Sequence, residues 1–120
     1  MEQKKTLVVG ASPNPERYSY KAVERLRQNG HPVYAFGFRE GTIADVTMST
    51  AWPTEGFDTV TLYLNPQRQQ QYYERILALR PKRVLFSPGT ENPPFERQLS
   101  ESGIVAEEVC TLVLLSIGEY

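Results

Sequence analysis

The chain has 120 residues, of which 13 are lysine or arginine and 14 are aspartate or glutamate. This length predicts one domain, residues 1–120, and is large enough for a single continuous core. Because the charges nearly balance and form no block of one sign, we expect no nucleic acid and no membrane as partners. The single Cys110 and single His31 exclude an internal disulfide, a multi-cysteine zinc site and a histidine cluster, so no metal site is predicted.

The N-terminal segment does not resemble a signal peptide, because residues 2–5 are polar and lead directly into an apolar stretch. The longest apolar run near the other end, residues 112–115, is far too short to cross a bilayer. We therefore expect a cytoplasmic protein.

The first expected element is a strand at residues 7–9, which is apolar on both faces as a buried parallel strand requires. A loop of small residues follows and leads to a helix at 20–29. Ser19 is the predicted N-cap of this helix and Gly30 its C-cap residue. His31 lies in the next turn, where we expect a solvated side chain.

A second strand is expected at 33–36, followed by an irregular segment at 39–56 that contains at most a short strand near Val46. Residues 57–64 alternate between apolar and other side chains over their second half, which predicts a further strand.

Two Asn-Pro pairs mark helix starts, because asparagine accepts a bond at the N-cap and proline is tolerated at the first helical position. Asn65-Pro66 begins a helix that is predicted to run to about Arg80. Asn92-Pro93 begins another that is predicted to end at Gly103. Short strands are expected before and after the second helix, at 84–86 and 104–106.

The alternation of strands and helices predicts an α/β fold of three layers with a mostly parallel sheet. The simplest layout has the first strand central, the second and third strands on one side and the fourth and fifth on the other. A topological switch point then lies between the first strand and the strand that ends at Leu64. Ligands of such sheets bind at this crevice, beyond the carboxyl ends of the strands.

The loop after the first strand is the leading candidate for a ligand contact. Peptide N–H groups of Ala11 and Ser12 and the positive end of the next helix converge there, as at sites that bind nucleotide phosphates. The loop lacks the glycine and lysine pattern of a P-loop, which disfavours hydrolysis of a nucleoside triphosphate, and it lacks the full G-x-G-x-x-G pattern. The alternative is an ordinary connection between a strand and a helix.

Two further loops add candidate contacts at the same edge. Arg39 follows the second strand and suits a ribose-linked phosphate, because its planar guanidinium binds phosphate through two hydrogen bonds. Phe36 or Phe38 could flank an adenine, although Phe36 suits the core and Arg39 could equally be solvated. In the loop at 87–90, Gly89 permits close approach of a ligand, or serves only as part of a common turn pair.

Three segments of the chain resemble stand-alone CoA-binding domain proteins. Residues 8–20 resemble their opening motif, residues 88–93 their fifth-strand loop, and residues 108–111 their C-terminal segment. These proteins are similar to the nucleotide-binding domain of the succinyl-CoA synthetase alpha subunit and of ADP-forming acyl-CoA synthetases. The likeness covers essentially the whole chain in order. It departs from the family at Gly37-Phe38, where Asn-Pro or Ser-Pro is frequent, and His31 does not match the phosphorylated histidine of the synthetases.

The resemblance implies a Rossmann-like fold whose small-molecule nucleotide ligand is coenzyme A or an acyl-CoA. By position, the residues along the pyrophosphate and the nucleotide path are Gly10, Ala11, Ser12, Arg17 and Ser19. The loop at the adenosine and its 3′-phosphate contains Gly37, Phe38 and Arg39, and the opposite wall contains Asn65, Pro66, Pro88 and Gly89.

We therefore expect non-catalytic binding of CoA or an acyl-CoA. One alternative is a small enzyme that uses NAD(P) or an acyl thioester. Against it stand the incomplete glycine pattern, the lack of an acidic ribose contact after the second strand, and the lack of an acid–base pair. Another alternative is a regulatory subunit with a vestigial crevice. A protein partner or a homodimer remains open.

Overall fold

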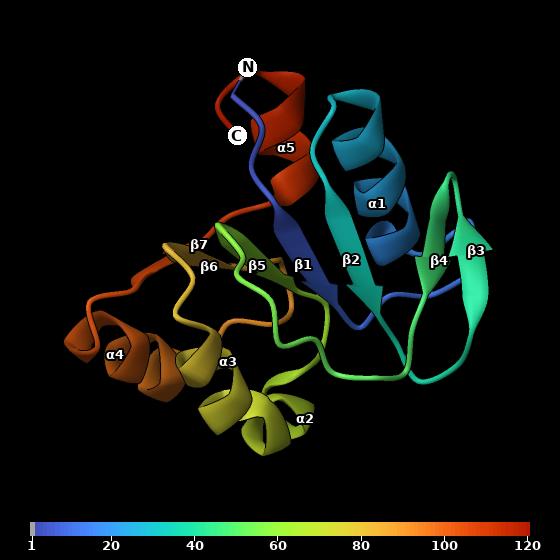
Figure 1. The fold of residues 1–120 in the computed structure, drawn as a ribbon. Coiled ribbons are helices and arrows are strands. Elements are labelled where there is room, and N and C mark those ends of the chain that lie inside the picture. The colour runs from blue at the N-terminus through green and yellow to red at the C-terminus, as the bar shows by residue number, and fades with distance from the viewer. Residues whose placement is uncertain (1) are drawn as a thin grey trace.

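The computed structural model, which describes residues 2–120, contains a five-stranded sheet in which all neighbouring strands are parallel (Figure 1). The strand order is β2-β1-β5-β6-β7. The strands are β1 (Thr6–Val9), β2 (Val33–Phe36), β5 (Thr59–Leu62), β6 (Arg83–Phe86) and β7 (Val105–Glu108). The α/β fold with a mostly parallel sheet is therefore confirmed. The first strand lies inside the sheet, between β2 and β5.

Helices cover both faces of the sheet, because successive residues of each strand point to opposite sides. Leu7 and Val9 belong to the core beneath one set of helices, whereas Val8 belongs to the core beneath the other set. On the first face lie α2 (Pro66–Gln69), α3 (Tyr73–Leu79) and α4 (Pro93–Glu101), and on the second lie α1 (Tyr18–Gln28) and α5 (Thr111–Ser116) (Figure 1). This three-layer arrangement is Rossmann-like.

A small antiparallel sheet occupies the segment that was expected to be irregular. It consists of β3 (Gly41–Ile43) and β4 (Val46–Met48), and the bridge from Phe36 to Ser49 joins its end to β2. The expected layout put a strand near Val46 beside the second strand in the main sheet, and this was wrong. Ile43, Val46 and Met48 instead pack into the core on the α1 side.

Helix α1 begins two residues earlier than expected. A turn precedes it, in which Arg17 N–H donates to Asn14 O at 3.0 Å and Glu16 N–H donates to Asn14 Oδ1 at 3.0 Å. Arg17 is therefore the N-cap, and its side chain makes no capping bond. The prediction of Ser19 as N-cap was wrong, because Ser19 lies inside the first turn and is only 4% exposed.

The helix start at Asn65 is confirmed, since Asn65 Oδ1 accepts a bond from Arg68 N–H at 2.9 Å. The helix is not continuous to Arg80, however. A 3-10 helix at Gln70–Tyr72 separates α2 from α3, and Arg80 follows α3 with a φ of 49°. Gln69 at the end of α2 and Tyr72 at the end of this turn are both buried.

The second Asn-Pro start is also confirmed, because the Asn92 side chain accepts a bond from Phe95 N–H at the start of α4.

His31 was expected to be solvated, and this was wrong. Its side chain is fully buried, accepts a bond at Nδ1 from Lys4 N–H at 3.0 Å and packs against the Tyr120 ring. The segment before β1 and the C-terminal residues lie side by side next to α5 (Figure 1), and Lys4 Nζ donates to Tyr120 O at 2.6 Å. No helix among residues 2–120 is both long and apolar enough to cross a membrane.

Candidate functional site

A cleft with a volume of about 540 Å³ lies at the carboxyl ends of β1, β5 and β6. Loops that are far apart in the sequence meet there because parallel strands all end at the same edge of the sheet. Its lining consists of Gly10, Ala11, Ser12, Pro13, Arg17, Tyr18, Ser19, Phe38, Arg39, Tyr63, Leu64, Asn65, Arg68, Pro88, Gly89 and Thr90.

Most residues that the sequence singled out line this cleft, and three do not. Phe36 is buried in the core, so of the two phenylalanines considered for the adenine only Phe38 lines the cleft. Gly37 lies behind the wall, where an added Cβ would be 2.6 Å from Ala11 O and 2.7 Å from Met48 Cε. Its role is therefore close packing of the β2 loop against the β1 loop. Pro66 is the first residue of α2 and stands behind Asn65, which does line the cleft.

The β1–α1 loop forms the floor of the cleft. Gly10 has a φ of 92°, and both Gly10 N–H and Ala11 N–H donate to Phe36 O at 2.9 Å. Ala11 N–H was expected to be available to a ligand, and this was wrong, because the carbonyl at the end of β2 already accepts from it. Ser12 N–H has no hydrogen-bond acceptor among residues 2–120. It is therefore the free peptide donor of this loop.

The N-terminus of α1 opens onto the same floor. No side chain caps this helix, and its first turn contains no acidic residue. The first N–H groups of an α-helix have no partner inside the helix and carry a partial positive charge. Arg17, Tyr18 and Ser19, which begin the helix, all line the cleft. This end of the cleft therefore favours an anionic group.

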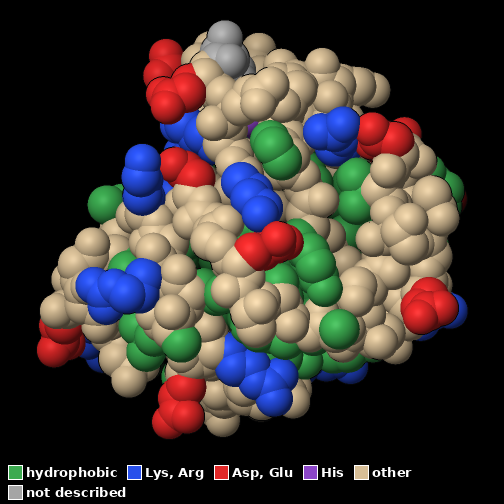
Figure 2. Space-filling view, in the orientation of Figure 1, with side chains coloured by type: hydrophobic (Ala, Val, Ile, Leu, Met, Phe, Trp, Pro, Cys, Tyr) green, Lys and Arg blue, Asp and Glu red, His purple; other side chains and the backbone are tan. Residues whose placement is uncertain are grey.

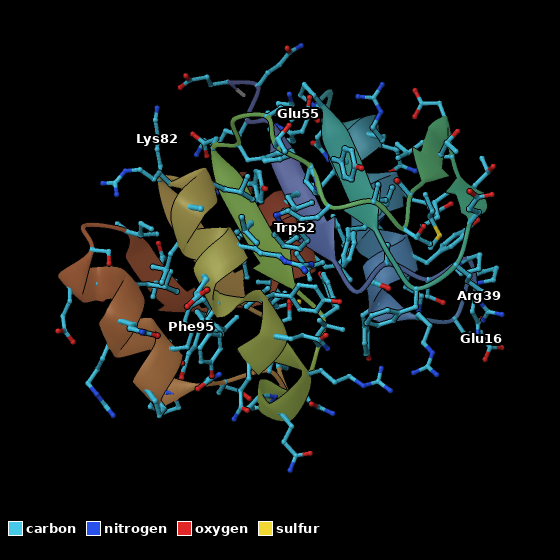
Figure 3. All side chains as sticks on the ribbon, turned by 60° about the horizontal axis from the view of Figure 1, so that its bottom comes forward. Glu16, Arg39, Trp52, Glu55, Lys82 and Phe95 are labelled. Atoms are coloured by element: carbon cyan, nitrogen blue, oxygen red, sulfur yellow. The ribbon has the colours of Figure 1, made fainter. Side chains whose placement is uncertain are left out.

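Three arginines stand around the cleft: Arg17, Arg39 and Arg68. Within the described chain, none of them forms an ion pair with a carboxylate. Glu16 is the labelled carboxylate near Arg39 in Figure 3, and the two side chains form no ion pair. Figure 2 shows basic side chains at the lower edge of the molecule, the edge toward which β1 and β2 point in Figure 1. Unpaired guanidinium groups near a helix N-terminus suit a ligand with several phosphates.

Aromatic side chains form part of the rim and of the inner wall. Tyr18 is 69% exposed and Phe38 is 55% exposed, and the Arg68 guanidinium lies 5.6 Å from the centre of the Phe38 ring. Tyr63 lines the inner wall, and its burial raises the pKa of its hydroxyl above the ordinary value. Tyr63 is therefore a neutral hydrogen-bonding group near neutral pH.

A buried side chain that the sequence did not single out connects two walls of the cleft. Gln69 Nε2 donates to Leu64 O and to Thr90 O, each at 2.8 Å. Leu64 follows β5 and Thr90 follows β6, and both line the cleft. A sequence signal for this role is weak, because a glutamine on a short helix is ordinarily a solvated residue.

The other missed residues have clearer signals. Pro13, Tyr18 and Thr90 lie in loops that the sequence already identified, and Tyr63 and Leu64 end the strand that was predicted at 57–64. Arg68 lies three residues after the Asn65 cap, on the first turn of α2. The lining contains no aspartate, glutamate, histidine, lysine or cysteine among the described residues. The cleft itself therefore supplies basic and neutral groups to a ligand.

Comparison with solved structures supports the fold and the likeness. A crystal structure of an uncharacterized protein is 49% identical over the full length of both chains, with a TM-score of 0.96. A protein from Thermus thermophilus is 25% identical, with a TM-score of 0.85 over 98% of this chain and 91% of the other. A hypothetical protein from Pyrococcus horikoshii OT3 is also 25% identical, with a TM-score of 0.80 over 93% and 81% of the two chains.

The search of curated proteins found no match. A family model described as a CoA-binding domain matches residues 4–116, which include every strand and helix described above. The matched segment contains the whole cleft, from Gly10 to Thr90. On this evidence, the chain belongs to the family of CoA-binding domains.

Proposed function

We propose that this protein binds coenzyme A or an acyl-CoA in the cleft and does not transform it. The observation that carries the proposal is the coincidence of three unpaired arginines with the uncapped N-terminus of α1. CoA carries a pyrophosphate and a ribose 3′-phosphate, so it supplies the several anionic groups that such a site favours. The membership of the family supports the same ligand.

The residues divide among the parts of this ligand by their position. Ser12 N–H and the first turn of α1 would bind the pyrophosphate, together with Arg17. Arg39, on the loop after β2, would bind the 3′-phosphate. The exposed rings of Tyr18 and Phe38 offer stacking surfaces for the adenine. This leaves Asn65, Pro88 and Gly89 as the opposite wall of the cleft.

The lining argues for binding without chemistry. General acid–base catalysis needs a group that titrates near the working pH. The described lining offers arginines and tyrosines, and burial moves the pKa of Tyr63 upward, away from neutrality. A turnover of CoA thioesters or of NAD(P)H that is lost on mutation of a cleft residue would contradict this part of the proposal.

Calorimetric titration with CoA tests the proposal directly. We expect one ligand per chain, and weaker binding of dephospho-CoA, which lacks the 3′-phosphate. Absence of both heat and thermal stabilisation at millimolar CoA would overturn the proposal. Mass spectrometry of the natively purified protein would identify a co-purifying CoA species and its acyl group.

The Arg39→Ala variant tests the assignment of the 3′-phosphate. Loss of a charge-assisted bond costs about 1.5–3 kcal/mol, so we expect CoA binding to weaken by roughly 10- to 150-fold. Binding of dephospho-CoA should change little, which narrows the preference between the two ligands. Arg97→Ala, on the exposed side of α4, is the matched control. An unchanged preference in Arg39→Ala would refute this role of Arg39.

A further inference from the structure

We propose that Gln69 is a positioning residue that fixes the spacing of the β5–α2 and β6–α4 loops, and that CoA affinity depends on this spacing. The inference rests on the proposed function for its ligand. Gln69 does not line the cleft, so its effect would pass through the loops that do.

The contacts of Gln69 are those of a cross-link between loops. Its side chain is only 1% exposed, and Nε2 donates one hydrogen to Leu64 O and the other to Thr90 O. Both bonds measure 2.8 Å. The two acceptors lie 26 positions apart in the sequence, at residues 64 and 90, and both belong to the wall of the cleft. One amide group therefore joins two walls.

The sheet itself does not hold these loops together. The parallel pairing of β5 with β6 ends at Leu62 and Phe86. Beyond that pair, no backbone hydrogen bond in the described chain connects residues 63–66 to residues 87–91. The side chain of Gln69 therefore connects the two loops beyond the sheet, at Leu64, two residues past the end of β5, and at Thr90, four residues past the end of β6.

The orientation of the Gln69 amide is fixed by a second buried amide. Gln69 Oε1 accepts a bond from Asn92 Nδ2 at 2.9 Å, and Asn92 Nδ2 also donates to the Tyr73 hydroxyl at 2.6 Å. A reversed Gln69 amide would place Oε1 against two carbonyl oxygens and its NH₂ against another NH₂. Since every polar atom of the Gln69 side chain is paired, the group is rigid, as a positioning role requires.

The Gln69→Met variant removes both donors and keeps the length of the side chain. It leaves two buried carbonyls without their partner, so the loops are expected to separate. We expect CoA affinity, measured by calorimetry on the folded protein, to fall at least tenfold with the stoichiometry unchanged. Gln71→Met, at an exposed position of the 3-10 helix that follows Gln69, is the control and should bind as the wild type does. A Gln69→Met dissociation constant within twofold of the wild type would overturn the inference.

A second variant distinguishes positioning from a general loss of structure. Glu at position 69 can donate one hydrogen bond when its carboxyl is protonated and none when it is ionised. The charged or titratable groups near this network are Arg68 on α2, Tyr73 on α3, Glu91 in the loop after β6, Glu96 on α4, which reaches Asn92 N–H, and Glu108 on β7, which interacts with Glu96 and Glu91. Relative to wild type at each pH, we expect Gln69→Glu to regain CoA affinity between pH 8 and pH 5.5. Gln69→Met should show no such recovery. If the ratio of variant to wild-type CoA affinity stays constant with pH for both variants, the positioning role of Gln69 is contradicted.

Amide hydrogen exchange without ligand completes the test. We expect faster exchange at the amides of Ser87, Gly89 and Thr90 in Gln69→Met than in the wild type, with Gln71→Met unchanged. Equal exchange in all three proteins would overturn the inference whatever the ligand proves to be. A wild-type protein that fails to bind CoA, with faster exchange in Gln69→Met, would instead refute the proposed function and leave the loop connection standing.

Discussion

A comparison of two glycines tests how tightly the β1 loop is packed. Gly10 and Gly89 both line the cleft and both have a φ of 92°. An added Cβ at Gly10 would lie 2.9 Å from Leu64 Cδ2 and 3.0 Å from Tyr63 O. At Gly89 it would meet no atom within 4 Å. The two positions therefore share the unfavourable backbone and differ in the space beside it.

The expected magnitudes follow from these two contributions. A non-glycine residue at positive φ costs about 1–2 kcal/mol, which applies to Gly10→Ala and Gly89→Ala alike. The clash at Gly10 adds about 1–3 kcal/mol, because Tyr63 O belongs to the backbone beside β1 and cannot rotate away. The entropy change that alanine brings to the unfolded chain is the same in both variants and cancels in the comparison.

Equilibrium unfolding in urea, without ligand, measures both variants. We expect Gly10→Ala to be less stable than Gly89→Ala by about 1–3 kcal/mol, with a melting temperature lower by roughly 3–5 °C for each kcal/mol. Equal free energies of unfolding for the two variants would refute the reasoning, because backbone strain alone would then account for both losses.

Three further predictions concern the core, a helix cap and pH. Phe95→Ala should lower the free energy of unfolding by about 3–5 kcal/mol in urea, because the ring is fully buried against Tyr73 and Phe86; a loss of under about 1 kcal/mol would contradict this packing. Asn65→Ala should lower the free energy of unfolding in urea by about 0.5–2 kcal/mol, because α2 loses its N-cap bond, whereas Asn65→Asp should keep most of this stabilisation. Burial lowers the pKa of His31 below its ordinary value of 6.5, with Lys4 and Arg83 acting in the same direction and Asp58 against it. The stabilisation from neutral His31 is therefore complete above pH 6.5 and declines as the pH falls below that value. In urea unfolding at pH 7 and pH 5, the free energy of unfolding should fall less in His31→Gln than in the wild type, and equal falls would contradict the assignment.

The course of the elements along the chain could be predicted from local patterns. Apolar runs on both faces identified the buried parallel strands, and the two Asn-Pro pairs located the starts of α2 and α4. These signals are local because a cap bond or a strand face involves residues close together in the sequence. The start of α1 was misplaced because two local signals competed: Ser19 resembled an N-cap, but the turn closed by Asn14 starts the helix two residues earlier.

The partners of individual polar groups could not be predicted in this way. Sequence reasoning treated His31 as solvated and Ala11 N–H as free, whereas Tyr120 covers the first and Phe36 O accepts from the second. In both cases the partner lies at least 25 positions away in the sequence, so no pattern of neighbouring residues could predict the contact.

Local patterns were enough to predict a parallel α/β sheet with a loop and a helix N-terminus at its carboxyl edge, because apolar periodicity and helix caps are properties of neighbouring residues. Which groups share the cleft and which lie behind it depends on how distant segments pack together. Arg68 joins Arg17 and Arg39 there, and Gln69 pairs with carbonyls of two loops, because the parallel strands bring distant segments to one edge. Such pairings depend on strand order and on side-chain burial, and both are set by the packing of the whole chain.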